Sequence, residues 1–269
     1  MAFLPKSADF YLQLHACRVS LYAQPVSVSA RSQTTKATLG VRELVFEGAL
    51  KRGERVSEVV LAERLGVSRT PLRIALTTLA HEGLLEPLSG GGFVVRSFTQ
   101  SDVADAIELR GVLEGTAARF AAERLGSQLE LEPLVRLVEQ LDAIVQDLSP
   151  ESFVRYVELN DAYHEGLVAL AKSPTLARSI ANVYVLPFAS PGALLSSQAL
   201  LPRSREVLVV AQHQHRGLIE AIRDGHGTRA QDLGREHARL ALLNLRFVLD
   251  DGSALDELRG ASLLRAVAG

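Results

Sequence analysis

The chain has 269 residues, a formal net charge of −2 and a hydrophobic content of 47%. This length allows two domains, and the hydrophobic content excludes wholesale disorder. The small net charge argues against a protein that coats nucleic acid through bulk electrostatics, although it leaves room for a local basic surface.

Leucine and alanine dominate the sequence, tryptophan is absent and strand signals are few, so we expect a mainly α protein. The single cysteine, Cys17, excludes an intrachain disulfide and a cysteine-based zinc site, and it fits a reducing cytoplasm. The most apolar region, 183–201, is broken by Pro187 and Pro191, and no uninterrupted apolar run approaches the roughly 20 residues of a membrane helix. The N-terminus lacks a continuous signal-peptide core. We therefore expect a cytoplasmic protein with no membrane partner.

The N-terminal segment, residues 1–36, shows no sustained period and ends in a polar run over 29–36. We expect it to be a flexible tail. Apolar residues at Val41, Leu44 and Val45 then predict a short amphipathic helix over 37–50, which Gly53 closes.

A pair of short helices is predicted within residues 56–95. Ser57 can cap the first helix, Gly66 breaks it, and Ser68 can cap the second. The second helix carries an apolar stripe and a separate exposed stripe, each at helical spacing. The apolar stripe is Leu72, Leu76 and Leu79, and the exposed stripe is Arg69, Arg73 and Thr77.

Two short extended runs follow the second helix, separated by the glycines 90–92. This order of caps, turn, stripes and glycine turn predicts a winged helix-turn-helix over residues 37–97. A recognition helix places its N-terminal residues against base edges, which suits arginine and small hydroxyl side chains there. The alternative is an αα-hairpin whose arginines are simply solvated. With eight Lys/Arg and seven Asp/Glu in this region, DNA binding would rest on placement rather than net charge.

The segment LAERLGVSRTPLRIAL, followed by GLLE and a glycine turn, resembles the DNA-binding domain of the GntR superfamily of bacterial transcription regulators. The resemblance implies that Arg69 and Arg73 contact DNA, that Ser68 and Thr70 lie near phosphates, and that the wing with Gly92 reaches the minor groove. Two positions depart from the family pattern. Arg52 replaces the usual proline before Gly53, and the wing reads Ser-Gly-Gly-Gly over 89–92 instead of carrying Asn-Arg-Gly.

After a polar connector at 97–100, Ser101 and Asp102 can start a further helix. Helical periods continue in all following segments, so residues 101–250 are expected to form an antiparallel all-α bundle. Residues 251–269 are expected to be a C-terminal tail.

Three helices of this bundle, over 150–172, 205–223 and 228–249, each turn one histidine inward from an otherwise apolar face. These residues are His164, His215 and His237. A lone inward histidine is more often a hydrogen-bonded core residue than a ligand. Three on successive helices favour a shared metal ion, which would satisfy all three imidazoles at once.

The segment Asn160-Asp161-Ala162-Tyr163-His164, with the two later histidines, resembles the FCD ligand-binding domain of FadR-type GntR regulators. The resemblance implies that Asn160, His164, His215 and His237 hold a divalent metal ion. Zinc is favoured, while nickel and manganese also suit such ligands. Aspartate is commoner in the family at the position of Asn160, and on a helix both Asn160 and Asp161 could reach the ion.

Four neutral ligands would leave the ion its full charge, so the site would favour an anionic further ligand such as a small carboxylate effector. Arg110, on the inward stripe of the first bundle helix, could contact that carboxylate or could instead pair with Glu114.

Taken together, these features predict a homodimeric regulator, more often a repressor relieved by a metabolite, that binds palindromic double-stranded operator DNA. The rival interpretation is a metal-dependent hydrolase that uses the three-histidine site. Against it, no inward carboxylate has an evident claim to act as general base.

Overall fold

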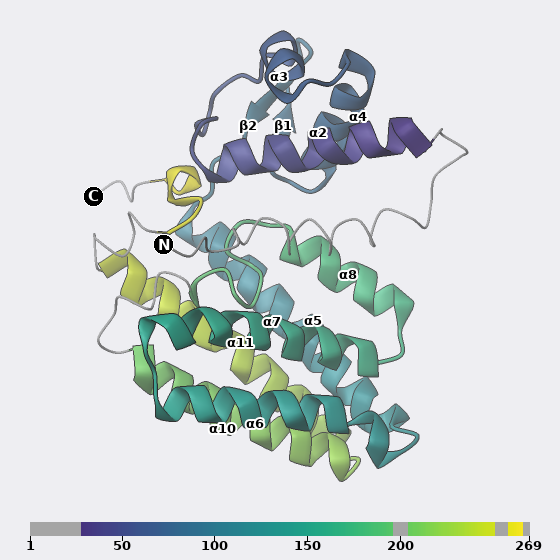
Figure 1. Ribbon diagram of the computed structural model, residues 1–269, viewed down its shortest axis with the longest axis vertical. Coiled ribbons are helices and arrows are strands. Elements are labelled where there is room, and N and C mark those ends of the chain that lie inside the picture. Colours follow the sequence, from purple (N-terminus) through teal and green to yellow (C-terminus); the bar gives the residue numbers. More distant parts are fainter. Residues whose placement is uncertain (1–27, 196–203, 251–257, 266–269) are drawn as a thin grey trace. The chain divides into compact units, whose positions relative to one another are not determined.

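The computed structural model describes residues 28–195, 204–250 and 258–265. The chain divides into two compact units, residues 1–97 and 98–269. Helices dominate both units, and the only sheet in the described part of the chain has two strands (Figure 1).

The described part of the first unit begins with α2 (Val28–Phe46). This helix starts nine residues before the predicted start and ends four residues before the predicted end, so the polar run at 29–36 is helical rather than part of a tail. The run contains no proline or glycine to break a helix. Residues 1–27 lie outside the described part. Val41 and Val45 of α2 are fully buried against the rest of the unit.

The predicted helix pair is confirmed as α3 (Glu58–Leu65) and α4 (Arg69–His81). The Ser57 side chain caps α3, and Gly66 ends it in the left-handed conformation at φ 60°. Ser68 occupies the N-cap of α4, but its side chain makes no capping hydrogen bond, contrary to expectation. The apolar stripe of α4 packs inward, with Leu72, Leu76 and Leu79 fully buried.

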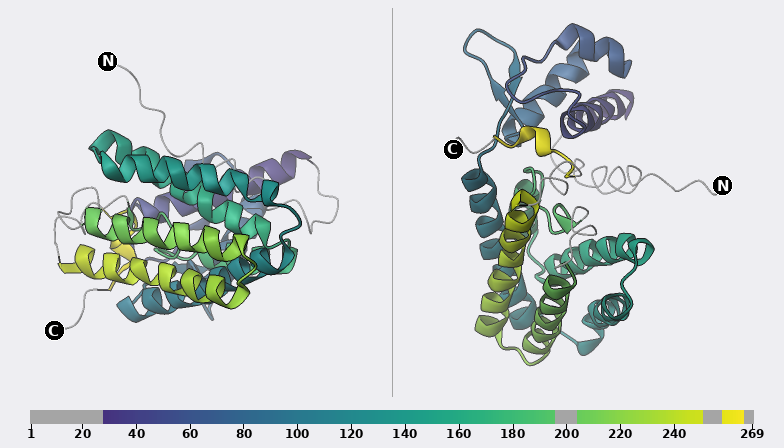
Figure 2. Two further views of the ribbon diagram at one scale, coloured as in Figure 1. Left: turned by 90° about the horizontal axis from the view of Figure 1, so that it is seen from below. Right: turned by 90° about the vertical axis from the view of Figure 1, so that its left-hand side faces the viewer.

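The strands β1 (Leu85–Pro87) and β2 (Phe93–Val95) form an antiparallel hairpin, in which Leu85 pairs with Val95. The right-hand view of Figure 2 shows the turn between them projecting from the helices of its own unit. Gly91 and Gly92 make this turn at φ 85° and 86°, a region that favours glycine. The unit is a winged helix-turn-helix.

The second unit is all-α in its described part. Its elements are α5 (Gln100–Arg124), η1 (Gln128–Glu130), α6 (Glu132–Gln146), α7 (Pro150–Leu170), α8 (Pro174–Tyr184), α10 (Ser204–Arg223), α11 (Gly227–Asp250) and η2 (Ala261–Leu263). Helix α5 begins two residues earlier than expected because Thr99, rather than Ser101, caps it through a capping box with Asp102. Helices α7, α10 and α11 begin and end within two residues of the bounds predicted for the three histidine-bearing helices.

Helices α5 and α11 lie side by side and antiparallel in all views (Figures 1 and 2). Glycines allow this close approach, because a Cβ atom on Gly234 would lie 2.9 Å from the Cα atom of Gly115. A Cβ atom on Gly111 would likewise lie 3.0 Å from the Cβ atom of Ala238. The result is an antiparallel bundle whose core includes Leu141, Tyr156 and Ile222.

The C-terminal segment 258–265, which falls within the expected tail, packs onto the start of the second unit. The Phe98 amide donates to the Leu263 carbonyl at 2.9 Å, and the Arg265 amide donates to the Phe98 carbonyl at 2.8 Å. Leu263 is fully buried. These contacts fix the chain just before α5 begins.

Candidate metal centre and nucleic-acid interface

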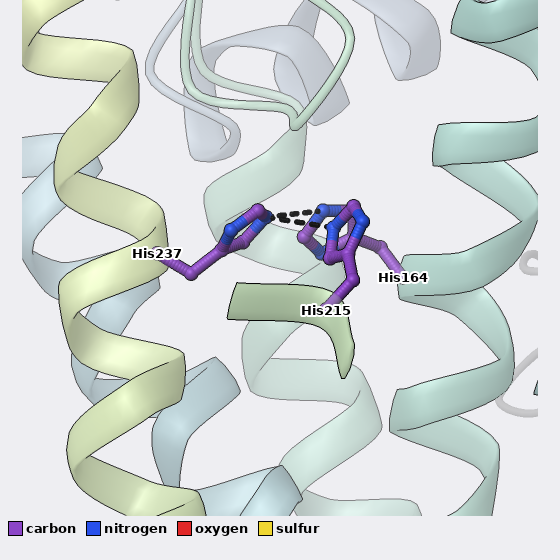
Figure 3. A group of neighbouring side chains, drawn as sticks. All are labelled: His164, His215 and His237. Atoms are coloured by element: carbon purple, nitrogen blue, oxygen red, sulfur yellow. Dashed lines mark hydrogen bonds between the residues drawn. The ribbon is translucent and has the colours of Figure 1, made fainter. Parts of the chain in front are cut away.

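The three inward histidines come together in the second unit, His164 from α7, His215 from α10 and His237 from α11 (Figure 3). Each offers one ring nitrogen, and these three atoms lie within 4.8 Å of one another. The Nε2 atom of His237 is 3.1 Å from Nε2 of His215 and 3.3 Å from Nε2 of His164. All three side chains are buried. The inward stripes predicted from the sequence therefore converge on one point.

These distances fit a shared tetrahedral ion. Nitrogens bound at about 2.0–2.1 Å to one tetrahedral zinc ion lie about 3.3–3.4 Å apart, close to the two Nε2 distances above. Among the described His, Cys, Asp and Glu residues, these three make the one group close enough to share an ion. The donor chemistry also suits a borderline divalent metal.

The protonation of His215 follows from the orientation of a neighbouring amide. The Nε2 atom of Gln212 donates to Oδ1 of Asp142 at 3.0 Å and to the carbonyl of Val138 at 3.3 Å. With the amide nitrogen between two acceptors, Gln212 turns its oxygen toward Nδ1 of His215, at 2.7 Å. Nδ1 must therefore carry the proton, which leaves the lone pair of Nε2 facing the other histidines.

The outer nitrogen of His237 has an acceptor as well, whereas that of His164 only has a carboxylate nearby. Oε1 of Gln214 is 3.1 Å from Nδ1 of His237. Oε2 of Glu114 is 3.5 Å from Nδ1 of His164, longer than a good hydrogen bond. The acceptors behind His215 and His237 favour the tautomer that presents their Nε2 lone pairs to the common point, which is the arrangement of metal-bound histidines.

Burial keeps the imidazoles of His215 and His237 neutral. Burial, with His237 and His164 nearby, holds the pKa of His215 well below its usual range. Burial lowers the pKa of His237 to about 3, assisted by His164 and opposed by Glu114. Neutral imidazole is the form that binds a metal ion.

Glu114 is a buried carboxylate whose charge is balanced within the unit. Burial alone would raise its pKa, but His164 and Arg110, with a hydrogen bond from the Tyr184 hydroxyl, hold the pKa of Glu114 at about 2. Its exposed fraction is 1%. An ionised carboxylate at this depth requires such partners.

Arg110 is buried and already engaged by the protein. Its Nη1 atom donates to the Ala189 carbonyl and its Nη2 atom to the Ala238 carbonyl, each at 3.0 Å. Its Nε atom lies 3.8 Å from Oε1 of Glu114. Of the two alternatives for Arg110, the pairing with Glu114 is thus present in the structure.

The two candidates for the fourth metal ligand, Asn160 and Asp161, lie in different surroundings. Asn160 is buried one turn before His164 on α7. Asp161 faces the loop after α8, since a Cβ atom on Gly192 would lie 2.7 Å from its Oδ1 atom. Burial raises the pKa of Asp161 to about 6, partly offset by His164. The carboxylate of Asp161 is not part of the close histidine group.

In the first unit, the residues expected to meet DNA are at the surface. Ser68, Arg69, Thr70 and Arg73 are all exposed in the first turns of α4, and Gly92 lies in the turn of the wing. Arg73 reaches Glu58 at the start of α3, with 3.4 Å between Nε and Oε2.

Sequence reasoning missed several residues that surround the site. These are Gln212 and Gln214 on α10, Asp142 on α6, and Tyr184 at the end of α8. The spacing of Gln212 three residues before His215 was an available signal, because side chains at i and i+3 meet on a helix. Nothing comparable in the local sequence marks Asp142 or Tyr184, which come from distant segments.

Comparisons with known proteins match both units. Residues 34–95 match the family described as bacterial regulatory proteins, gntR family, and residues 105–240 match the FCD domain. The Glc operon transcriptional activator of Escherichia coli (strain K12) is 26% identical over 84% of this chain and 91% of its own length. The probable D-xylose utilization operon transcriptional repressor of Paenarthrobacter nicotinovorans is 27% identical over 74% of this chain and 84% of its own length.

Among solved structures, E. coli McbR/YncC superposes with a TM-score of 0.54 at 23% identity, covering 81% of this chain and 97% of that one. This likeness supports the fold. No described helix is both long enough and apolar enough to cross a membrane.

Proposed function

Because the chain belongs to the gntR family of bacterial regulatory proteins and carries an FCD domain, it is a transcriptional regulator rather than an enzyme, and we propose that it binds operator DNA under the control of a metal-dependent effector site. The first unit would bind the DNA. The second would hold a divalent ion and a small carboxylate. The protein would act where its DNA lies, in the cytoplasm.

The DNA-binding proposal is supported by the exposed N-terminal turns of α4. Arg69 and Arg73 are exposed on the face of α4 next to the buried leucines, and Ser68 and Thr70 are exposed as well. Arginine side chains at these positions suit base edges, and small hydroxyls suit phosphates. A homodimer with a two-fold axis would place two such helices on a palindrome.

The metal proposal is carried by the three Nε2 atoms that share one point while acceptors lie behind the rings of His215 and His237. His164, His215 and His237 would hold the ion, with Asn160 as the fourth protein ligand in preference to Asp161. Zinc is the ion we favour, ahead of nickel and manganese. When bound, the ion would supply a positively charged attachment point for a carboxylate.

Arg110 would act on the effector mainly through charge. Both of its Nη atoms already donate to backbone carbonyls, and its charge offsets that of Glu114. The neutral ligands would then leave the ion's charge uncompensated, which favours an anionic effector.

We propose repression relieved by the effector as the mode of action. Relatives include both an activator and a probable repressor, so transcription with and without candidate organic acids decides between the two modes. A thermal-shift screen of small carboxylates on metal-loaded protein would identify the effector class, because a ligand that binds the folded state raises the melting temperature.

Two substitutions test whether the first unit binds DNA and the second unit binds the metal ion. Arg69→Ala is expected to remove specific operator binding in a gel-shift titration while metal content stays unchanged, since each good base contact is worth about 1–3 kcal/mol. Arg136→Ala serves as a charge-matched control, because Arg136 is exposed on α6 of the other unit. Unchanged operator affinity in Arg69→Ala would contradict the proposed DNA surface. His215→Ala is expected to weaken metal and effector binding without unfolding the first unit.

A further inference from the structure

The wing of this chain lacks a cationic side chain of its own. Residues 85–95 include one charged side chain, that of Glu86. The turn is closed by hydrogen bonds from the Leu88 amide to the Gly92 carbonyl at 3.0 Å and from the Gly91 amide to the Leu88 carbonyl at 2.9 Å. A wing of this composition carries no positively charged side chain that the negative potential of a minor groove could attract.

A segment before α3 runs along the free edge of β2 and supplies what the wing lacks. The Val56 amide donates to the Phe93 carbonyl at 2.8 Å, and the Val95 amide donates to the Glu54 carbonyl at 3.0 Å. Arg55 forms an isolated antiparallel bridge with Val94. Since side chains alternate along an extended segment, Val56 is buried while Arg55 is exposed.

The guanidinium of Arg55 lies on the turn of the wing. Its Nη2 atom donates to the Gly91 carbonyl at 3.1 Å. A Cβ atom on Gly92 would lie 3.7 Å from Nη2 and 3.8 Å from Nε, so the guanidinium covers this glycine directly. An arginine has five N–H donors. The bond to Gly91 uses one of them and holds the group in place, while others stay available to a ligand.

Arg55 is also close to the recognition helix. Glu58, three residues further on, contacts Arg73 of α4. Three residues of extended chain span at most about 11 Å. The Cα atom of Arg55 therefore lies no more than about 11 Å from that of Glu58, the residue that contacts Arg73.

From this arrangement we propose that Arg55 contacts the operator in the minor groove that flanks the bases read by α4, in place of an arginine in the wing itself. The inference rests on the proposed operator binding. A narrow A·T-rich minor groove attracts a guanidinium most strongly, so Arg55 would add a preference for A·T pairs at the operator flanks.

The test uses the full-length protein and a duplex selected from random DNA by the wild-type protein. Arg55→Ala is expected to weaken binding several-fold and to lower the slope of log affinity against log salt by about one. Arg55→Lys should restore the slope but not the flank preference, because an ammonium keeps the charge without the planar fork. Arg136→Ala controls for net charge and should match the wild type.

The preference for A·T pairs at the operator flanks is measured with inosine substitutions. An I·C pair presents the minor-groove edge of A·T and the major-groove edge of G·C, so it separates the two grooves. For the wild type, replacing flanking A·T by G·C should weaken binding, whereas replacing it by I·C should not. Arg55→Ala should respond to neither change.

The outcomes separate the inference from its premise. If the wild type selects no sequence, or if Arg69→Ala binds the selected duplex as the wild type does, the proposed operator binding fails. If Arg69→Ala loses binding but Arg55→Ala keeps the affinity, salt slope and flank preference of the wild type, the inference about Arg55 is wrong. A circular dichroism spectrum confirms that each variant is folded.

Discussion

The orientation of Gln212 makes a sharp prediction about metal affinity. Gln212→Leu replaces the acceptor at Nδ1 of His215 with a side chain of similar size that cannot accept a hydrogen bond. His215 is fully buried, so the Nδ1–H group would lose its 2.7 Å partner with no water to replace it. An unpaired buried donor costs about 1–3 kcal/mol. The ring would then favour protonation at Nε2, where a metal ion would have to displace the proton.

That free energy corresponds to roughly 5- to 150-fold weaker metal binding, in line with the about 10- to 100-fold effect of removing hydrogen-bond partners behind metal-bound histidines. The assay is competition for zinc between the metal-free protein and a chromophoric chelator. Gln140→Leu is the matched control, since Gln140 is exposed on α6 and bonds only to the Arg136 carbonyl one turn away. A folded Gln212→Leu variant that binds zinc within about twofold of the wild type would refute the reasoning.

Asp142 gives the same argument a second test. Asp142→Asn keeps an oxygen that can accept from the Gln212 amide, so metal affinity should remain close to that of the wild type. Asp142→Leu removes that acceptor and leaves only the Val138 carbonyl at 3.3 Å to orient the amide, so affinity should fall. Equal affinities in the two variants would show that Asp142 does not orient Gln212.

Two further predictions concern stability. The pKa of His237 is lowered to about 3 and that of His215 is also lowered, against about 6.5 in an unfolded chain, so the unfolded state binds more protons between these values. Metal-free protein should therefore lose stability as pH falls below about 6.5, and denaturant midpoints at about pH 8 and about pH 5 measure the loss. Gly234→Ala should destabilise by about 1–3 kcal/mol, because its Cβ atom would lie 2.9 Å from the backbone of Gly115. Gly217→Ala, whose Cβ atom would lie 3.4 Å from a leucine side chain, should cost nothing in the same urea titration.

Much of the fold follows from patterns of apolar residues. The stripes of the long helices specified which side of each helix is buried, and His164, His215 and His237 lie inward as those stripes require. What periodicity does not encode is the depth at which each helix sits against its neighbours. The convergence of three Nε2 atoms depends on that packing, including the close contact between α5 and α11.

The surroundings of the site were less predictable because they depend on contacts between distant segments. Arg110 and Glu114 are one helical turn apart, so their pairing was foreseeable. The Ala189 and Ala238 carbonyls that bind Arg110 come from 79 and 128 residues away and are backbone atoms, which no sequence pattern distinguishes. The hydrogen bond from Tyr184 to Glu114 was equally hard to predict, because the two residues lie 70 positions apart in the sequence.

In the winged unit, the local sequence predicted the order of helices and strands but not all of their contacts. Ser57 caps α3 as its residue type suggests, whereas Ser68 occupies the cap position of α4 without the capping bond. Val60 and Leu61 are both apolar residues of α3, yet Leu61 is buried while Val60 is 59% exposed. The helix is too short for spacing alone to define its buried face. The contact of Arg55 with the wing depends on strand pairing across some 36 residues.

The claim that three imidazoles form a metal site is tested most directly by elemental analysis of protein purified without an affinity tag. About one divalent ion per chain is expected in the wild type, most of it lost in His215→Ala. Metal-free wild-type protein should also rise in melting temperature when zinc, nickel or manganese is added. A wild type that carries no metal and whose melting temperature does not respond to any of these ions would contradict the account.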